Sequence, residues 1–141
     1  MKVKHLMTAT LLTAVLFVHA SGRAEGIVEQ YARTAATGAN DAYKRNLPDD
    51  GVTRSAKAYS DGKTLVHEYV LGIRQDAAEK ELAAWRAGTR SDVVPKTCAA
   101  LKNDDFFQKR GFQIRYRYLD QNSKVLDDFK VNKPACSAYG F

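Results

Sequence analysis

The sequence has few of the residues that most often carry chemistry. Its 141 residues include three histidines and two cysteines, and His67 is the histidine that remains once residues 1–20 are set aside. A Ser-His-Asp or Cys-His nucleophile system would have to use His67, yet no Gly-x-Ser-x-Gly elbow is present. Zinc and redox metals require several ligands at close spacing, and no such cluster occurs. We expect no catalytic residue, metal or cofactor, with a small envelope hydrolase using His67 as the alternative.

The sequence also lacks a strong excess of charge and a second long apolar run. It has 22 Lys and Arg against 16 Asp and Glu, a formal net charge of +6. Because this excess is mild and not clustered, nucleic acid is not expected as a partner. A membrane-spanning helix needs about 20 apolar residues, and none follows residue 20. We expect no stable membrane insertion of the mature chain.

The N-terminus has the form of a secretory signal peptide. A short basic head precedes the apolar run "LMTATLLTAVLFV" and the small-residue exit "HASGRAEG". Cleavage is expected after Ala20, with Ala24 as the second possibility, and no cysteine near either site would accept a lipid. Residues 1–20 are therefore predicted to be a signal peptide and residues 21–141 a single exported domain, periplasmic or secreted further.

The two cysteines, Cys98 and Cys136, are predicted to form a disulfide. Export places them where disulfides persist, and they lack the C-x-x-C spacing of redox-active pairs. The bridge would close a loop of about 38 residues and stabilise the fold by roughly 4 kcal/mol in the chain-entropy model. We expect a structural bridge.

Hydrophobic periodicity predicts helices and two hairpins. One apolar stripe at a spacing of four predicts an N-terminal helix, at Ile27, Tyr31, Ala35, Ala39 and Tyr43. Asp61-Gly62 between two alternating runs is a strong hairpin signal, with His67 on the predicted core face of the second strand. A second helix is expected from Asp76 to Gly88, a third over residues 94–101 and a short helical turn over residues 104–110. A second hairpin spans residues 112–131.

These elements predict an α+β domain in the order αββααββ. The simplest arrangement is a four-stranded antiparallel sheet with helices packed mainly on one face and one disulfide. The bridge would then fasten the third helix to the end of the last strand.

A candidate binding face lies on the second hairpin. Arg115 and Arg117 recur at every second residue, so they stand side by side on the face opposite the tyrosines, which Lys130 extends. Guanidinium groups can bind carboxylates in a bidentate manner. The alternative is a solubilising face with cross-strand ion pairs to Asp128.

The segments "DGKTLVHEYVL" and "FFQKRGFQIRYRYLDQNSKVLDDFKV", with a cysteine on either side of the second, resemble small exported bacterial proteins classed as putative quorum-sensing-regulated virulence factors. The resemblance covers residues 47–136 and implies an exported α+β protein without catalytic residues. More distantly, the disulfide-stapled plan is similar to pilotins, the chaperones of outer-membrane secretins, which are commonly lipoproteins. The function favoured is a non-enzymatic module that binds another envelope or secreted protein, of the inhibitor, immunity or assembly-chaperone type.

Overall fold

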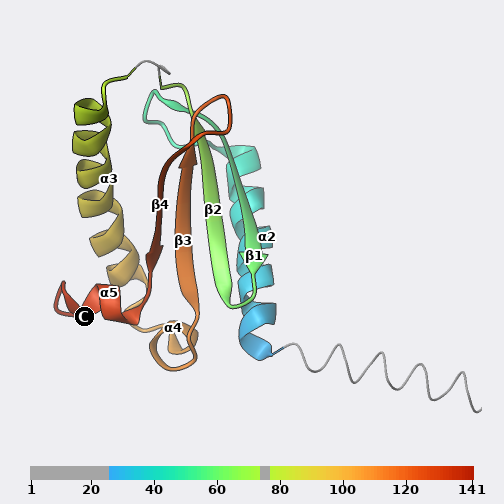
Figure 1. Cartoon of the computed structure of the whole chain (residues 1–141). Helices are drawn as coiled ribbons and strands as arrows, with labels where there is room; N and C mark the ends of the chain where they lie inside the picture. The colour runs from blue at the N-terminus through green and yellow to red at the C-terminus, as the bar shows by residue number, and fades with distance from the viewer. Residues whose placement is uncertain (1–25, 74–76) are drawn as a thin grey trace, which may run out of the picture.

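The structure is a computed structural model that describes residues 26–73 and 77–141. The predicted signal peptide and Asp76 lie outside the described residues. Along the chain the elements are α2 (Ile27–Arg45), β1 (Thr53–Asp61), β2 (Thr64–Leu71), α3 (Glu79–Ala100), α4 (Asp105–Lys109), β3 (Gln113–Leu119), β4 (Val125–Val131) and α5 (Lys133–Ser137). Figure 1 shows α2 beside β1 and β2, and α3 on the side of β4. The predicted α+β class is confirmed.

The four strands form one sheet in the order β1-β2-β3-β4. Both predicted hairpins are antiparallel, with Asp61 opposite Thr64 in the first and Ile114 opposite Val131 in the second. The two central strands, however, pair in parallel, with Leu65 opposite Ile114. The sheet is therefore mixed, and the prediction of a purely antiparallel sheet was wrong. The cause is α3, which carries the chain back along the sheet so that β3 starts at the same end as β2.

The predicted helical turn at residues 104–110 is present as α4, but the prediction that residues 76–88 and 94–101 form two separate helices was wrong. One 22-residue helix, α3, runs through both Gly88 and Pro95. A glycine costs a helix only about 1 kcal/mol relative to alanine, which packing overcomes. Proline is more costly because it has no N–H to donate to the carbonyl of Ser91 and its ring crowds that turn. The helix continues because its C-terminal half is held at buried Thr97 and Cys98.

The inner face of α2 is centred one residue away from the predicted stripe. Its fully buried side chains are Val28, Ala32 and Ala36, whereas Ile27 is 57% exposed. The other stripe residues are partly buried against the same core, at Tyr31, Ala35, Ala39 and Tyr43. Small side chains along this face let α2 lie close to β1 and β2.

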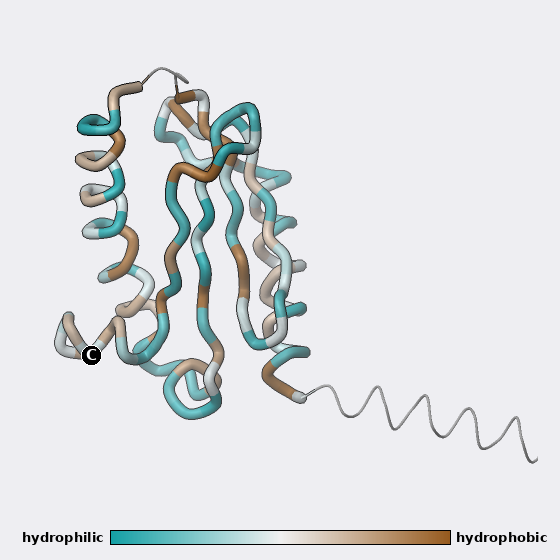
Figure 2. Tube along the Cα trace, viewed as in Figure 1, coloured by the Kyte–Doolittle hydropathy of each residue, from teal (hydrophilic) through white to brown (hydrophobic). Residues whose placement is uncertain are grey.

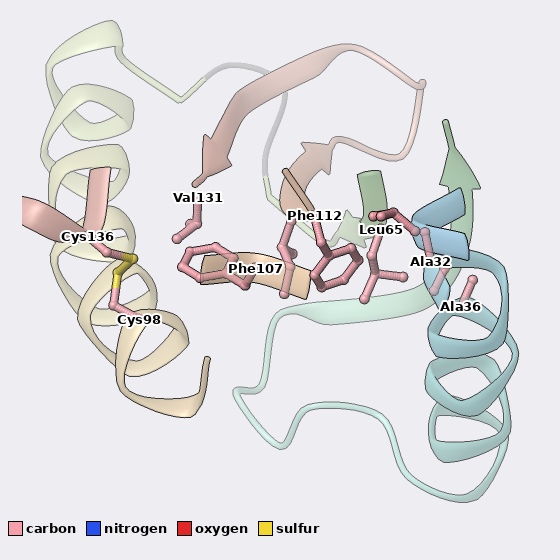
Figure 3. Packing of buried hydrophobic residues seen from close by; sticks show 11 residues of the cluster. Ala32, Ala36, Leu65, Cys98, Phe107, Phe112, Val131 and Cys136 are labelled. Carbon is pink, nitrogen blue, oxygen red and sulfur yellow. A yellow bond between two sulfur atoms is a disulfide. The ribbon is translucent and has the colours of Figure 1, made fainter. Parts of the chain in front are cut away.

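The core lies between the sheet and the helices. Figure 3 shows the part of the core around Phe107 of α4. There Phe107 and Phe112 connect Leu65 and Ala32 on one side with Val131 on the other. A second cluster at the other end of the sheet joins β2, α3, β3 and β4, at Leu71, Leu82, Tyr118 and Leu126. Figure 2 shows apolar and polar positions alternating along the strands, as expected for a sheet with one packed face.

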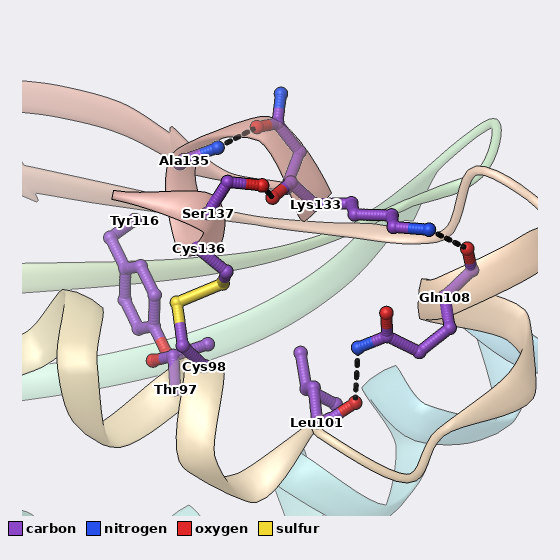
Figure 4. Close-up of a disulfide and its surroundings, with 10 residues drawn as sticks. Thr97, Cys98, Leu101, Gln108, Tyr116, Lys133, Ala135, Cys136 and Ser137 are labelled. Carbon is purple, nitrogen blue, oxygen red and sulfur yellow. Dashed lines mark hydrogen bonds between the residues drawn. A yellow bond between two sulfur atoms is a disulfide. The ribbon is translucent and has the colours of Figure 1, made fainter. Parts of the chain in front are cut away.

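The predicted disulfide between Cys98 and Cys136 is present, with the Cα atoms 5.4 Å apart. Cys136 lies in the short helix α5 and not at the end of β4, so the bridge joins two helices (Figure 4). Next to the bridge the Thr97 hydroxyl lies 2.8 Å from the Tyr116 hydroxyl, which fixes the same turn of α3 to the sheet. None of the helices in the described part of the chain combines the length and hydropathy that a bilayer span requires.

Candidate functional site

Strand alternation gives the sheet two faces with different character. On β2, Leu65, His67 and Tyr69 point toward the helices, while Val66 and Glu68 point to the other face. The first face carries an apolar groove. The second carries the predicted arginines. In the described part of the chain the helices pack on the first face, so we refer to the second as the uncovered face.

The groove lies between α3 and the segment that leads into β1, and its volume is about 390 Å³. Apolar and aromatic side chains form most of it, from Pro48, Val52, Tyr69, Leu71, Trp85, Val93 and Tyr118, with Asp50, Thr53, Thr89 and Asp92 as its polar members. The Trp85 ring meets the Tyr118 ring edge-on at 5.4 Å, and Tyr118 stacks on Tyr69 at 5.2 Å. Leu47, near Pro48, is another large apolar side chain that is 40% exposed.

The α3 wall of the groove is tied to β4 by two arginines. The Arg90 guanidinium donates to both carboxylate oxygens of Asp127, at 2.5 and 3.0 Å, and lies 5.0 Å from the Phe129 ring. One turn earlier, Arg86 donates to the Leu126 carbonyl at 2.6 Å. These contacts hold the turn that carries Trp85, so the groove has a fixed wall.

The opposite wall is shaped by Asp50. Its carboxylate accepts hydrogen bonds from the backbone N–H groups of Val52 and Thr53, at 2.9 and 2.7 Å, and from the Thr53 hydroxyl at 2.5 Å. Burial alone would raise the pKa of Asp50, but the hydrogen bonds from Thr53 and Val52 outweigh it and lower the pKa. Asp50 therefore stays ionised at the groove. Asp92, the other acidic residue of the lining, is exposed and forms a surface ion pair with Lys96.

His67 lies beside the groove in a cluster of tyrosines. Its Nδ1 atom is 2.6 Å from the Tyr43 hydroxyl, which is 2.7 Å from the Tyr69 hydroxyl. Its ring stacks on Tyr116 at 5.4 Å. Burial lowers the pKa of His67 to about 4, so the ring is neutral at pH 7. The partner of its Nδ1 atom is a tyrosine and not the carboxylate that orients the histidine of a Ser-His-Asp triad.

The structure brings the three predicted binding residues together on the uncovered face. Four side chains at one level of the sheet form what we call the ion-pair row, with one residue from each strand: Lys57, Glu68, Arg117 and Asp128. Along the row the N–O distances are 3.1 Å for Lys57–Glu68 and 3.3 Å for both Glu68–Arg117 and Arg117–Asp128. Arg115 adds a bidentate pair with Asp128 at 2.7 and 2.6 Å.

Arg115 and Arg117 thus form ion pairs within the chain. Cross-strand ion pairs with Asp128 are what the alternative hypothesis of a solubilising face predicted. The hydrogen bonds from Arg115 lower the pKa of Asp128, and the partners of each arginine raise its pKa. Lys130 lies opposite Arg115 on β4 and is exposed. The Nε atom of Arg117 is buried without a hydrogen bond, although Asp128 is close.

The groove is the feature that sequence reasoning missed. Its lining comes from residues 48–53, β2, α3 and β3, so no local motif carries it. A partial signal existed in Trp85, the one tryptophan of the chain. Among the described residues, no group of three or more His, Cys, Asp or Glu side chains is placed to hold a metal ion.

No protein-family model and no curated protein match the chain. Among solved structures, the type II secretion system pilotin AspS from Vibrio cholerae matches with a TM-score of 0.53 and 14% identity, over 83% of this chain and 99% of that one. The pilotin EpsS from the Vibrio vulnificus type 2 secretion system is a further match, with a TM-score of 0.45 and 12% identity, over 77% and 94%. The AspS match shows a shared fold. The resemblance to quorum-sensing-regulated virulence factors gains no support, whereas the more distant likeness to pilotins is the one that the fold bears out.

Proposed function

We propose that the chain is an exported, non-enzymatic protein-binding module of the assembly-chaperone type, with residues 1–20 removed as a signal peptide and residues 21–141 forming the mature domain. The observation that carries this proposal is the aromatic groove between α3 and the residues leading into β1. Its volume of about 390 Å³ accommodates a few apolar side chains. The shared fold with a protein described as a pilotin supports the chaperone type among the binding functions.

The occupant we propose is an apolar segment of an envelope protein, and this segment carries one basic residue. By analogy with pilotins, the envelope protein would be a secretin. Trp85, Tyr69 and Tyr118 offer large apolar surfaces to such a segment, in the manner of helix-in-groove recognition. Asp92 is exposed, and its surface pair with Lys96 is worth under about 1 kcal/mol, so a basic side chain of the partner can replace Lys96.

The test uses a photo-crosslinking amino acid at Val93 in the groove, in cells that export the tagged chain. The matched control places the same group at Thr34, which is exposed on α2. The proposal expects an envelope protein crosslinked from position 93 and not from position 34, at an apolar segment that contains a lysine or arginine.

The crosslinked segment is then made as a peptide and titrated into the purified protein. Trp85 is the one tryptophan of the chain, so its emission reports binding in the groove directly. Asp92→Asn is expected to weaken binding about three- to tenfold, and Thr34→Ala is expected to leave it unchanged. A peptide that binds without changing the emission of Trp85, or equal crosslinking from both positions, would overturn the proposal.

A further inference from the structure

The uncovered face is a sheet surface on which the charges are ordered across the strands. The ion-pair row reads positive, negative, positive, negative from β1 to β4, because Lys57, Glu68, Arg117 and Asp128 are successive partners in the strand register. Its inner members are largely shielded by their neighbours, since the side chain of Glu68 is 11% exposed and that of Arg117 is 27% exposed. The row is therefore preorganised before any partner arrives.

When a second copy of this row faces the first and runs in the opposite direction, each charge lies opposite a charge of the other sign. Consider a two-fold axis parallel to the strands that passes between β2 and β3 of two facing sheets. It places β1 of one copy over β4 of the other, and β2 over β3. Lys57 then faces Asp128 of the second copy, and Glu68 faces Arg117. From this we infer that the uncovered face binds a second copy of the same chain.

The levels on either side of the row are compatible with the same axis. At one level Val70 pairs with Leu119 along the sheet, so the two lie opposite each other between copies, with the half-buried Val70 offering the contact surface because Leu119 is 8% exposed. At the other level Tyr59 on β1 faces Lys130 on β4, a favourable approach of an ammonium group to an aromatic ring. Face-to-face sheets with nearly aligned strands are a common packing mode, at a separation of about 10 Å.

The size of the face determines the expected affinity. Four strands at about 4.8 Å spacing and seven residues at about 3.3 Å give a footprint of roughly 450 Å² per copy, or about 900 Å² in total. This is below the roughly 1,200–2,000 Å² of stable interfaces, so the dimer is expected to be weak and concentration-dependent. Charges that are already paired within each copy lose little side-chain freedom on association, which favours a weak specific dimer over none.

The test is sedimentation equilibrium of the mature protein from about 10 μM to 1 mM, with two reciprocal charge reversals. Lys57→Glu places a glutamate opposite Asp128 of the second copy, and Asp128→Lys places a lysine opposite Lys57 of the second copy. Each variant alone is expected to dimerise at least about tenfold more weakly than the natural chain. An equimolar mixture is expected to recover the association, because each pair of facing charges is then opposite in sign.

The recovery on mixing separates association from folding, since ion pairs within a copy are not repaired by adding another chain. Lys57 is 65% exposed, so Lys57→Glu is expected to fold, and thermal melting checks both variants. If Asp128→Lys does not fold, Asp128→Asn takes its place and the mixture is expected to recover part of the association. Lys44→Glu on α2 is the matched control and should dimerise like the natural chain. A natural chain that stays monomeric to 1 mM, a dimer that Lys57→Glu leaves unchanged, or a mixture that does not recover would each overturn the inference.

Discussion

The burial of His67 predicts that the fold loses stability in mild acid. The ring is neutral in the folded chain because burial lowers its pKa to about 4, from about 6.5 when exposed. As the pH falls below about 6.5 the unfolded chain binds a proton at His67 that the folded chain does not, so unfolding becomes more favourable. The difference of about 2.5 pKa units corresponds to about 3 kcal/mol at most, lost between pH 6.5 and pH 4.

The assay is urea denaturation of the mature protein at pH 7.5, 6.5, 5.5 and 4.5. The free energy of unfolding is expected to be nearly constant down to about pH 6.5. Below that pH it is expected to decrease, with a slope that approaches about 1 kcal/mol per pH unit. Asp128, whose pKa is lowered by its hydrogen bonds from Arg115, contributes mainly below this window. Once residues 1–20 are removed, His67 is the one histidine of the chain.

His67→Gln is the matched variant, because its side-chain oxygen can accept the hydrogen bond from Tyr43 but does not titrate. This variant should show no decline between pH 6.5 and pH 4.5, even if its stability at pH 7.5 is lower. A natural chain whose stability is constant across this window, or a glutamine variant with the same decline, would refute the assignment of a buried neutral histidine.

Two further predictions concern the bridge and the sheet edge. Replacing Cys98 and Cys136 with alanine should destabilise the fold by roughly 4 kcal/mol, measured by urea denaturation against the natural chain with and without reductant; an unchanged midpoint would contradict it. Asn40→Ala removes both side-chain hydrogen bonds to the Ala58 backbone at the outer edge of β1, each 2.7 Å long. It should lower the free energy of unfolding by about 1–2 kcal/mol and speed hydrogen exchange at the Ala58 amide. Exchange as slow as in the natural chain would show that Asn40 does not protect this edge.

Local signals predicted the hairpins and the pairing of cysteines well. Asp61-Gly62 and the alternation of the flanking runs determine the first hairpin within the segment itself, and the turn after Leu119 does the same for the second. The direction of β3 relative to β2 has no such local determinant. It depends on the 22-residue length of α3, which the sequence obscured because Gly88 and Pro95 ordinarily end helices.

The same contrast between local and tertiary determinants applies to the predicted binding residues and to the groove. The alternation of Arg115 and Arg117 was enough to place both on one face, opposite Tyr116 and Tyr118. Glu68, a partner of Arg117, could not be predicted, because it becomes a neighbour of Arg117 only through the parallel pairing of β2 and β3. The groove is harder still to predict from the sequence, because it also depends on the position of α3 over the sheet.

The parallel central pair links these observations to the two proposals. It places Glu68 beside Arg117 and thereby completes the alternating signs of the ion-pair row on one face. It also places Tyr69 beside Tyr118 on the other face, where the two rings stack in the groove. Because neighbouring residues of a strand point to opposite faces, Glu68 and Tyr69 serve separate surfaces although they are adjacent in sequence. Charge reversals on the uncovered face should therefore leave peptide binding in the groove intact, and changes at Asp92 should leave the dimer intact, so each proposal can fail without the other.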